Sequence, residues 1–189
     1  MNKIFAGMFF IFLNFNLELD SVTIGLVPDF VGYILLFMGM RELENLSGYF
    51  ADRKKTCIPM AFYTGILYII DLIGLSAVGD EIDLKYAILL LCEIISCIIS
   101  LEILYSIIKG IEDIEHRYFC DLNYEKLILI WKAILAAVVI TYVCLVFVSV
   151  LSLFAAIANF ILTIIFLYQF NITRKSYYYI LANQQEVNQ

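Results

Sequence analysis

Six apolar runs dominate the sequence, and each is close to the length that crosses a membrane. An α-helix rises 1.5 Å per residue, so about 20 apolar residues span the roughly 30 Å hydrocarbon core. The runs cover residues 4–19, 22–40, 58–78, 87–108, 127–148 and 153–170. With 63% hydrophobic residues, the chain has too little polar surface for a water-soluble fold. We therefore predict an all-α integral membrane protein, a bundle of about six transmembrane helices.

The length of 189 residues leaves no room for a separate soluble catalytic domain. We predict a single transmembrane domain over residues 1–182 and a polar, disordered tail over 183–189. The first run is short and contains Asn14 and Asn16, so it either spans the membrane or forms a re-entrant or interfacial segment. The last two runs are nearly continuous, and the chain is expected to turn back near residues 149–152.

Basic residues fall on one side of this predicted topology. With a cytoplasmic N-terminus, the outer loops hold only Lys85, and Lys132 lies inside a span. The outer loops instead carry acids such as Glu18 and Asp80. This asymmetry is the positive-inside pattern and places both termini in the cytoplasm. The cytoplasmic basic residues are Lys3, Arg41, Arg53, Lys54, Lys55, Lys109, Arg117, Lys126, Arg174 and Lys175.

Several polar residues interrupt the apolar runs at a similar depth. Counting along each helix places Asp29, Asp71, Glu93 and Asn159 in one layer, somewhat outside the membrane midplane. Ionisable groups at such positions are costly and usually face protein or water. One interpretation is a site for a proton, a metal cation or an amine-bearing solute. The other is that these groups are protonated, or satisfied by Tyr68, Asn159 and the backbone, and serve only helix association.

The second run carries a stripe of small residues. Gly25, Gly32 and Gly39 recur every seven residues, a pattern typical of close helix packing, and Asp29 lies beside the stripe. Pro28 offers an alternative start for this helix, because Pro and Asp are both favoured in a first turn. In that case residues 21–27 enter as irregular chain, and Asp29 lies at the mouth of an outward-facing pocket.

Glu102 lies out of phase with Glu93 on the same helix and closer to the cytoplasm. Lys132, in the fifth run, is at a similar depth. We therefore predict a structural ion pair between Glu102 and Lys132, because each charge alone is less favourable in hydrocarbon than the pair.

Catalytic and metal-binding patterns are not found. The five cysteines include no C-x-x-C pair, and the single histidine, His116, lies in a charged connector with Glu112 and Glu115 that reads as a solvated helix face. No phosphate-binding loop, zinc-protease or hydrolase motif occurs. We predict no enzymatic activity, no metal, no cofactor and no nucleic-acid partner.

The stretch 12–46 resembles a known group of proteins, most clearly at Val27, Pro28, Asp29, Phe30, Val31, Gly32, Tyr33, Ile34 and Leu35. It is similar to uncharacterised small multi-pass membrane proteins of low-GC Gram-positive bacteria. The resemblance covers about a fifth of the chain and implies a bacterial plasma-membrane location but no mechanism. Where that pattern often has an acid before the loop, this sequence has Asn14.

Two functional hypotheses follow. The first is a small transporter, or a solute- or cation-binding membrane subunit, that uses the acidic layer and forms a homo-oligomer or joins a membrane complex. The alternative is a non-catalytic accessory, assembly or immunity membrane protein whose buried acids are structural. A third hypothesis, an intramembrane enzyme acting on lipid, requires a cavity open to the bilayer beside the acids.

Overall fold

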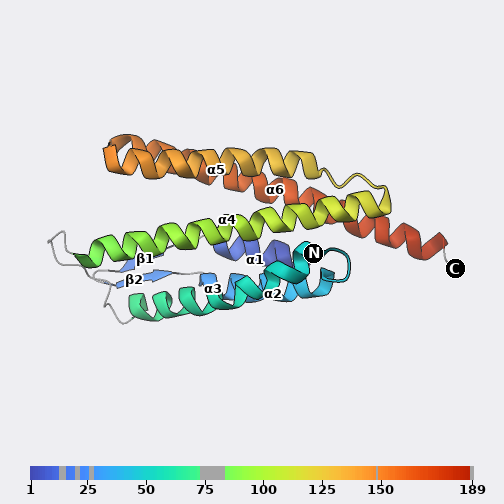
Figure 1. Ribbon diagram of the computed structural model, residues 1–189, viewed down its shortest axis with the longest axis horizontal. Coiled ribbons are helices and arrows are strands. Elements are labelled where there is room, and N and C mark those ends of the chain that lie inside the picture. The colour runs from blue at the N-terminus through green and yellow to red at the C-terminus, as the bar shows by residue number, and fades with distance from the viewer. Residues whose placement is uncertain (13–15, 20–21, 26–27, 73–83, 148, 188–189) are drawn as a thin grey trace. The chain divides into compact units, whose positions relative to one another are not determined.

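The computed structural model of the chain describes residues 1–12, 16–19, 22–25, 28–72, 84–147 and 149–187. Within these residues it contains six α-helices and one β-hairpin (Figure 1). The chain divides into two compact units, Met1–Ile103 and Leu104–Gln189, with the boundary inside helix α4. The sequence had suggested one domain over residues 1–182. Each unit is described by itself.

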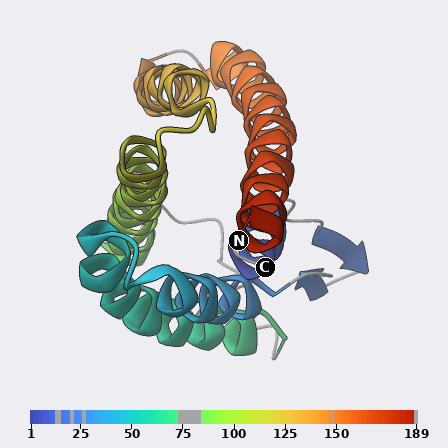
Figure 2. The same cartoon turned by 90° about the vertical axis from the view of Figure 1, so that its right-hand side faces the viewer.

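The N-terminal unit is built around helix α2, Asp29–Leu43, which packs against α1 on one face and α3 on another. Helix α1 covers Asn2–Phe12, and α3 covers Gly48–Leu72. Figure 2 shows α2 and α3, in blue to cyan and cyan to green, running alongside each other. The unit also includes the first part of α4, Leu84–Tyr118. Buried side chains of this core include Ile4, Met8, Leu36, Met40 and Phe50.

An antiparallel β-hairpin lies between α1 and α2 in the sequence. Strand β1, Asn16–Leu19, pairs with β2, Val22–Gly25, so that Asn16 lies opposite Gly25 and Leu19 opposite Val22. The prediction of helices over 4–19 and 22–40 is therefore wrong at residues 16–19 and 22–25. The β-branched residues Val22, Thr23 and Ile24 favour strand, and Pro28 disfavours helix in the residue before it.

The C-terminal unit consists of the rest of α4 and two long helices that pack along each other. Helix α5 covers Tyr124–Phe147, and α6 covers Ser149–Val187. Residue 148, between the two helices, lies outside the described residues, and the change of helix comes just before the predicted turn at 149–152. The predicted disorder of the tail is wrong for residues 183–187, which are helical. No Gly or Pro interrupts residues 171–187, so the helix has no local reason to end earlier.

Three described helices are long and apolar enough to cross a membrane. They are Leu91–Tyr118, Tyr124–Leu145 and Val150–Asn183, with mean hydropathies of 2.1, 2.4 and 2.6. Helix α1 is apolar but has only 11 residues, a length of roughly 16 Å, which is about half the hydrocarbon thickness. The chain thus has the composition and helix lengths of a membrane protein.

Candidate functional site

Asp29 occupies the first turn of α2, directly after Pro28. Pro28 is extended, with φ −74° and ψ 123°, and its carbonyl accepts a hydrogen bond from Val31 N at 3.1 Å. The structure thus realises the alternative start in which the helix begins after Pro28, although the chain before it contains a hairpin strand. A carboxylate in a first turn is stabilised by the helix dipole.

The carboxyl group of Asp29 is incompletely satisfied. Its Oδ1 is buried and has no hydrogen-bond partner among the described residues. The other buried side-chain oxygen without a described partner is Oδ1 of Asn159. Leaving a buried acceptor unpaired costs about 1–3 kcal/mol, so each of these atoms is a candidate position for a bound proton or ligand. Both residues belong to the polar layer that the sequence predicted.

Glycines hold α2 against α1. A Cβ atom at Gly32 would lie 2.6 Å from Ile11 Cγ1 and 2.8 Å from the carbonyl oxygen of Gly7. A Cβ atom at Gly39 would lie 2.6 Å from Ile4 Cγ1. Two members of the predicted stripe therefore pack as expected, whereas Gly25 lies in β2 and is not on the helix. Gly7 of α1 was not predicted as a packing residue, because its contact with α2 depends on which helices the fold brings together.

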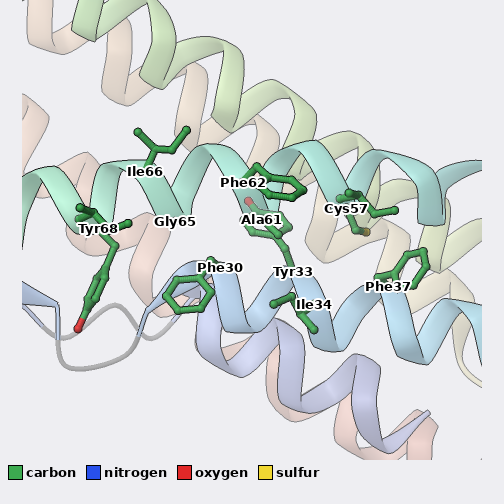
Figure 3. A pocket seen from close by; sticks show the side chains of 12 residues that line it. Phe30, Tyr33, Ile34, Phe37, Cys57, Ala61, Phe62, Gly65, Ile66 and Tyr68 are labelled. Atoms are coloured by element: carbon green, nitrogen blue, oxygen red, sulfur yellow. The ribbon is translucent and has the colours of Figure 1, made fainter.

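A cavity of 580 Å³ lies between α2 and α3 (Figure 3). Its walls are almost entirely apolar, and Phe30 and Tyr68 close one end with their rings 5.8 Å apart. Phe37 and Cys57 lie at the other end, since the two helices run in opposite directions. Tyr68, predicted as a site residue, does line a cavity. Its other lining residues are Tyr33, Ile34, Ile58, Ala61, Phe62, Gly65, Ile66 and Ile69.

The sequence contains a signal for this cavity in the apolar residues of α3. Ile58, Phe62, Ile66 and Ile69 recur at helical spacing on one face of α3, and all four are exposed, Phe62 by 70%. A continuous exposed apolar stripe beside a groove marks a surface meant for lipid or another apolar partner. The site residues predicted from the sequence are mostly polar and do not include this apolar stripe.

Two side-chain contacts connect α4 to this pair of helices. The hydroxyls of Tyr33 and Ser100 form a hydrogen bond of 2.7 Å, and Arg53 Nη1 lies 2.8 Å from Glu102 Oε2. Arg53 is thus a partner of Glu102 that the sequence prediction of a pair with Lys132 did not consider. Lys132 is exposed on α5 in the other unit, so the pairing of Glu102 with Lys132 stays a prediction.

The predicted four-residue layer is only partly described. The side chain of Asp71 lies outside the described part of the structure, and Asn159 belongs to the other unit. Glu93 is exposed on α4, so the expectation that it points into the protein is wrong. Neither Asp29 nor Glu93 lines the α2–α3 cavity. Asp29 is the residue next to its wall, because Phe30 follows it.

The charged connector between α4 and α5 is organised by Glu115. Its Oε2 accepts hydrogen bonds from Leu122 N at 2.8 Å and Tyr124 N at 3.4 Å. Thr173 on α6 donates to the Leu122 carbonyl at 2.7 Å. Glu115 therefore orders the turn. Among the described residues no group of three or more His, Cys, Asp or Glu side chains is arranged to hold a metal ion.

Comparison with known proteins finds no match: no family model, no curated protein and no solved structure is similar to this chain.

Proposed function

We propose that this chain is a non-catalytic, multi-pass protein of the bacterial plasma membrane that binds a proton, a cation or a small cationic solute at Asp29. The observation that carries the proposal is the buried Oδ1 of Asp29, which has no described partner at the start of a helix. A poorly solvated carboxyl group is more stable when it is protonated, or when its carboxylate form is paired with a cation. In the proposed topology about six apolar segments lie in the membrane, and both termini lie in the cytoplasm.

Infrared difference spectroscopy of the purified protein tests the binding site. A carboxyl group in a poorly solvated place gives a separate band when it is protonated, and the band changes when a cation replaces the proton. We expect sodium, potassium or methylammonium chloride to perturb a band that Asp29→Asn abolishes. Glu93→Gln is the matched control, because Glu93 is exposed and its removal is expected to leave the band intact.

Two results contradict this binding proposal. One is a wild-type spectrum with neither a protonated carboxyl band nor a response to any of the three cations. The other is an Asp29→Asn variant that responds like the wild type. If Asp29→Asn changes only the stability of the protein, the residue serves helix packing and the chain belongs with accessory or assembly proteins.

Cysteine labelling tests the proposed orientation separately. Cys120 lies in the α4–α5 connector, on the proposed cytoplasmic side. Burial, and then the nearby Glu115 carboxylate, raise the pKa of its thiol, so labelling is done at alkaline pH where the reactive thiolate forms. In a variant that retains only this cysteine, a membrane-impermeant maleimide is expected to react in inverted vesicles. Reaction in intact cells instead would reverse the proposed orientation.

A further inference from the structure

Two basic residues lie one helical turn beyond lining residues at one end of the α2–α3 cavity. Arg41 lies one helical turn beyond Phe37 on α2, and Lys55 lies one turn before Ile58 on α3. Both cations are exposed, and neither forms an ion pair with another described residue. The neighbouring Arg53 and Lys54, in contrast, are paired with Glu102 and Glu44.

The geometry points to an anionic phospholipid as the occupant: one acyl chain lies in the α2–α3 cavity, and its phosphate headgroup binds Arg41 and Lys55. The inference rests on the proposed topology, because that topology places both cations at the cytoplasmic surface. Basic residues between membrane helices on this side bind anionic headgroups.

The length of the α2–α3 cavity matches the thickness of one membrane leaflet. From Cys57 to Ile69 the α3 wall is roughly 18 Å long, at 1.5 Å per residue. Half of the hydrocarbon core is about 15 Å thick, which is the depth that one acyl chain occupies. The volume of 580 Å³ lies within the range of built ligand pockets. Figure 3 shows the groove running along both helices, from Phe37 and Cys57 to Phe30 and Tyr68.

The chemistry of the walls excludes most other occupants. A polar solute would leave its hydrogen-bonding groups unpaired along this surface. The Tyr33 hydroxyl already bonds to Ser100, so it is not available to a ligand as a new donor without breaking that contact. Hydrocarbon needs no such partners, and the exposed Phe62 and Ile66 at the rim suit surrounding acyl chains.

Native mass spectrometry of the full chain in a non-ionic detergent tests the inference. The probes are dioleoylphosphatidylglycerol and dioleoylphosphatidylcholine, which share their acyl chains and differ in net charge. We expect the wild type to prefer the anionic lipid. The double variant Arg41→Gln with Lys55→Gln is expected to lose about fivefold of that preference per cation removed, corresponding to about 1 kcal/mol for each basic residue.

Two matched controls separate the contribution of the lipid headgroup to binding from that of the acyl chain. Lys126→Gln with Lys175→Gln removes two exposed cations from the C-terminal unit and is expected to leave the preference unchanged. Ala61→Phe fills the groove and is expected to weaken binding of both lipids, whereas Ala136→Phe, on an exposed face of α5, is not.

Three results overturn the phospholipid site. The first is equal binding of the two lipids by the wild type. The second is a preference for the anionic lipid that survives in the Arg41 and Lys55 double variant. The third is a lipid-free dimer that Ala61→Phe dissociates, because the cavity would then bind a second copy of the chain. Labelling of Cys120 distinguishes this failure from that of the proposed topology. Cytoplasmic labelling without a lipid preference rejects the phospholipid site alone, and labelling from outside rejects the topology on which the site depends.

Discussion

In the N-terminal unit, helices contact each other at glycine residues and through hydrogen bonds between side chains. Gly32 and Gly39 bring α2 close to α1, and Tyr33 bonds to Ser100. In the C-terminal unit, two long apolar helices pack along each other, and a polar contact between elements lies at the connector, where Thr173 meets Leu122. The first arrangement depends on the size of single residues, whereas the second depends on satisfying polar groups at the end of the helices.

The largest expected effect comes from the glycine contact of the N-terminal unit. Gly32→Leu places a side chain where even a Cβ atom would lie 2.6 Å from Ile11. We expect the free energy of unfolding to fall by about 3 kcal/mol, the upper part of the range for overpacking. Denaturation in mixed detergent micelles, followed by circular dichroism, measures it.

Gly65→Ala is the matched control for that substitution. A Cβ atom at Gly65 would lie 3.7 Å from Phe30, which is ordinary van der Waals contact. The control is therefore expected to fold with unchanged or slightly higher stability, because alanine favours helix. Equal stability of Gly32→Leu and the wild type would refute the close approach of α1 and α2.

The next effect tests the connector of the C-terminal unit. Thr173 is fully buried, and Thr173→Val removes the donor to the Leu122 carbonyl. A carbonyl left unpaired in a buried place costs about 1–3 kcal/mol, and we expect a loss of about 2 kcal/mol in the same unfolding assay. The matched control is Thr141→Val, because the hydrogen bond described for Thr141 goes to the Ala137 carbonyl of its own helix. Equal losses in the two variants would show that the connector contact contributes nothing.

A smaller effect is expected for the contact between α2 and α4. Tyr33→Phe removes one hydroxyl from a hydrogen bond of 2.7 Å, and Ser100 keeps its bond to the Ser96 carbonyl. The expected loss is about 1 kcal/mol, the usual net value of one such bond. A double-mutant cycle with Ser100→Ala measures the coupling directly. Additive effects of the two substitutions would contradict the contact.

The smallest effect concerns the ion pair of Glu102. The side chains of Arg53 and Glu102 are 40% and 53% exposed, and pairs of that kind contribute about 0.2–1 kcal/mol. A double-mutant cycle of Arg53→Gln and Glu102→Gln is expected to show coupling of this size. The same cycle with Lys132→Gln tests the pair predicted from the sequence. Coupling in the second cycle alone would favour the pair predicted from the sequence.

The second apolar run shows which features could be predicted from nearby residues in the sequence. The spacing of Gly32 and Gly39 predicted a packing face, and both glycines do contact α1. Pro28 and Asp29 predicted an alternative helix start that the structure adopts. The same spacing also included Gly25, which lies in a strand. Periodicity identifies a face only where the chain is helical, and a seven-residue repeat alone cannot say where the helix begins.

The acidic layer shows where local reasoning failed. Asp29 and Asn159, which were singled out by their estimated depth, both have a buried oxygen without a described partner. The estimated depth could not say which way Glu93 faces, and that residue is exposed. The direction of a side chain relative to neighbouring helices depends on which helices are neighbours.

The sequence by itself determined a composition of the kind found in membrane proteins, because its long apolar runs exceed what a water-soluble surface can tolerate. It also determined the short-range features that a few residues specify, such as the start of α2 after Pro28. Only the tertiary structure decided that α2 and α3 enclose an apolar groove, and that Glu102 meets Arg53. Such contacts join residues far apart in the chain, and they arise from the packing of whole helices.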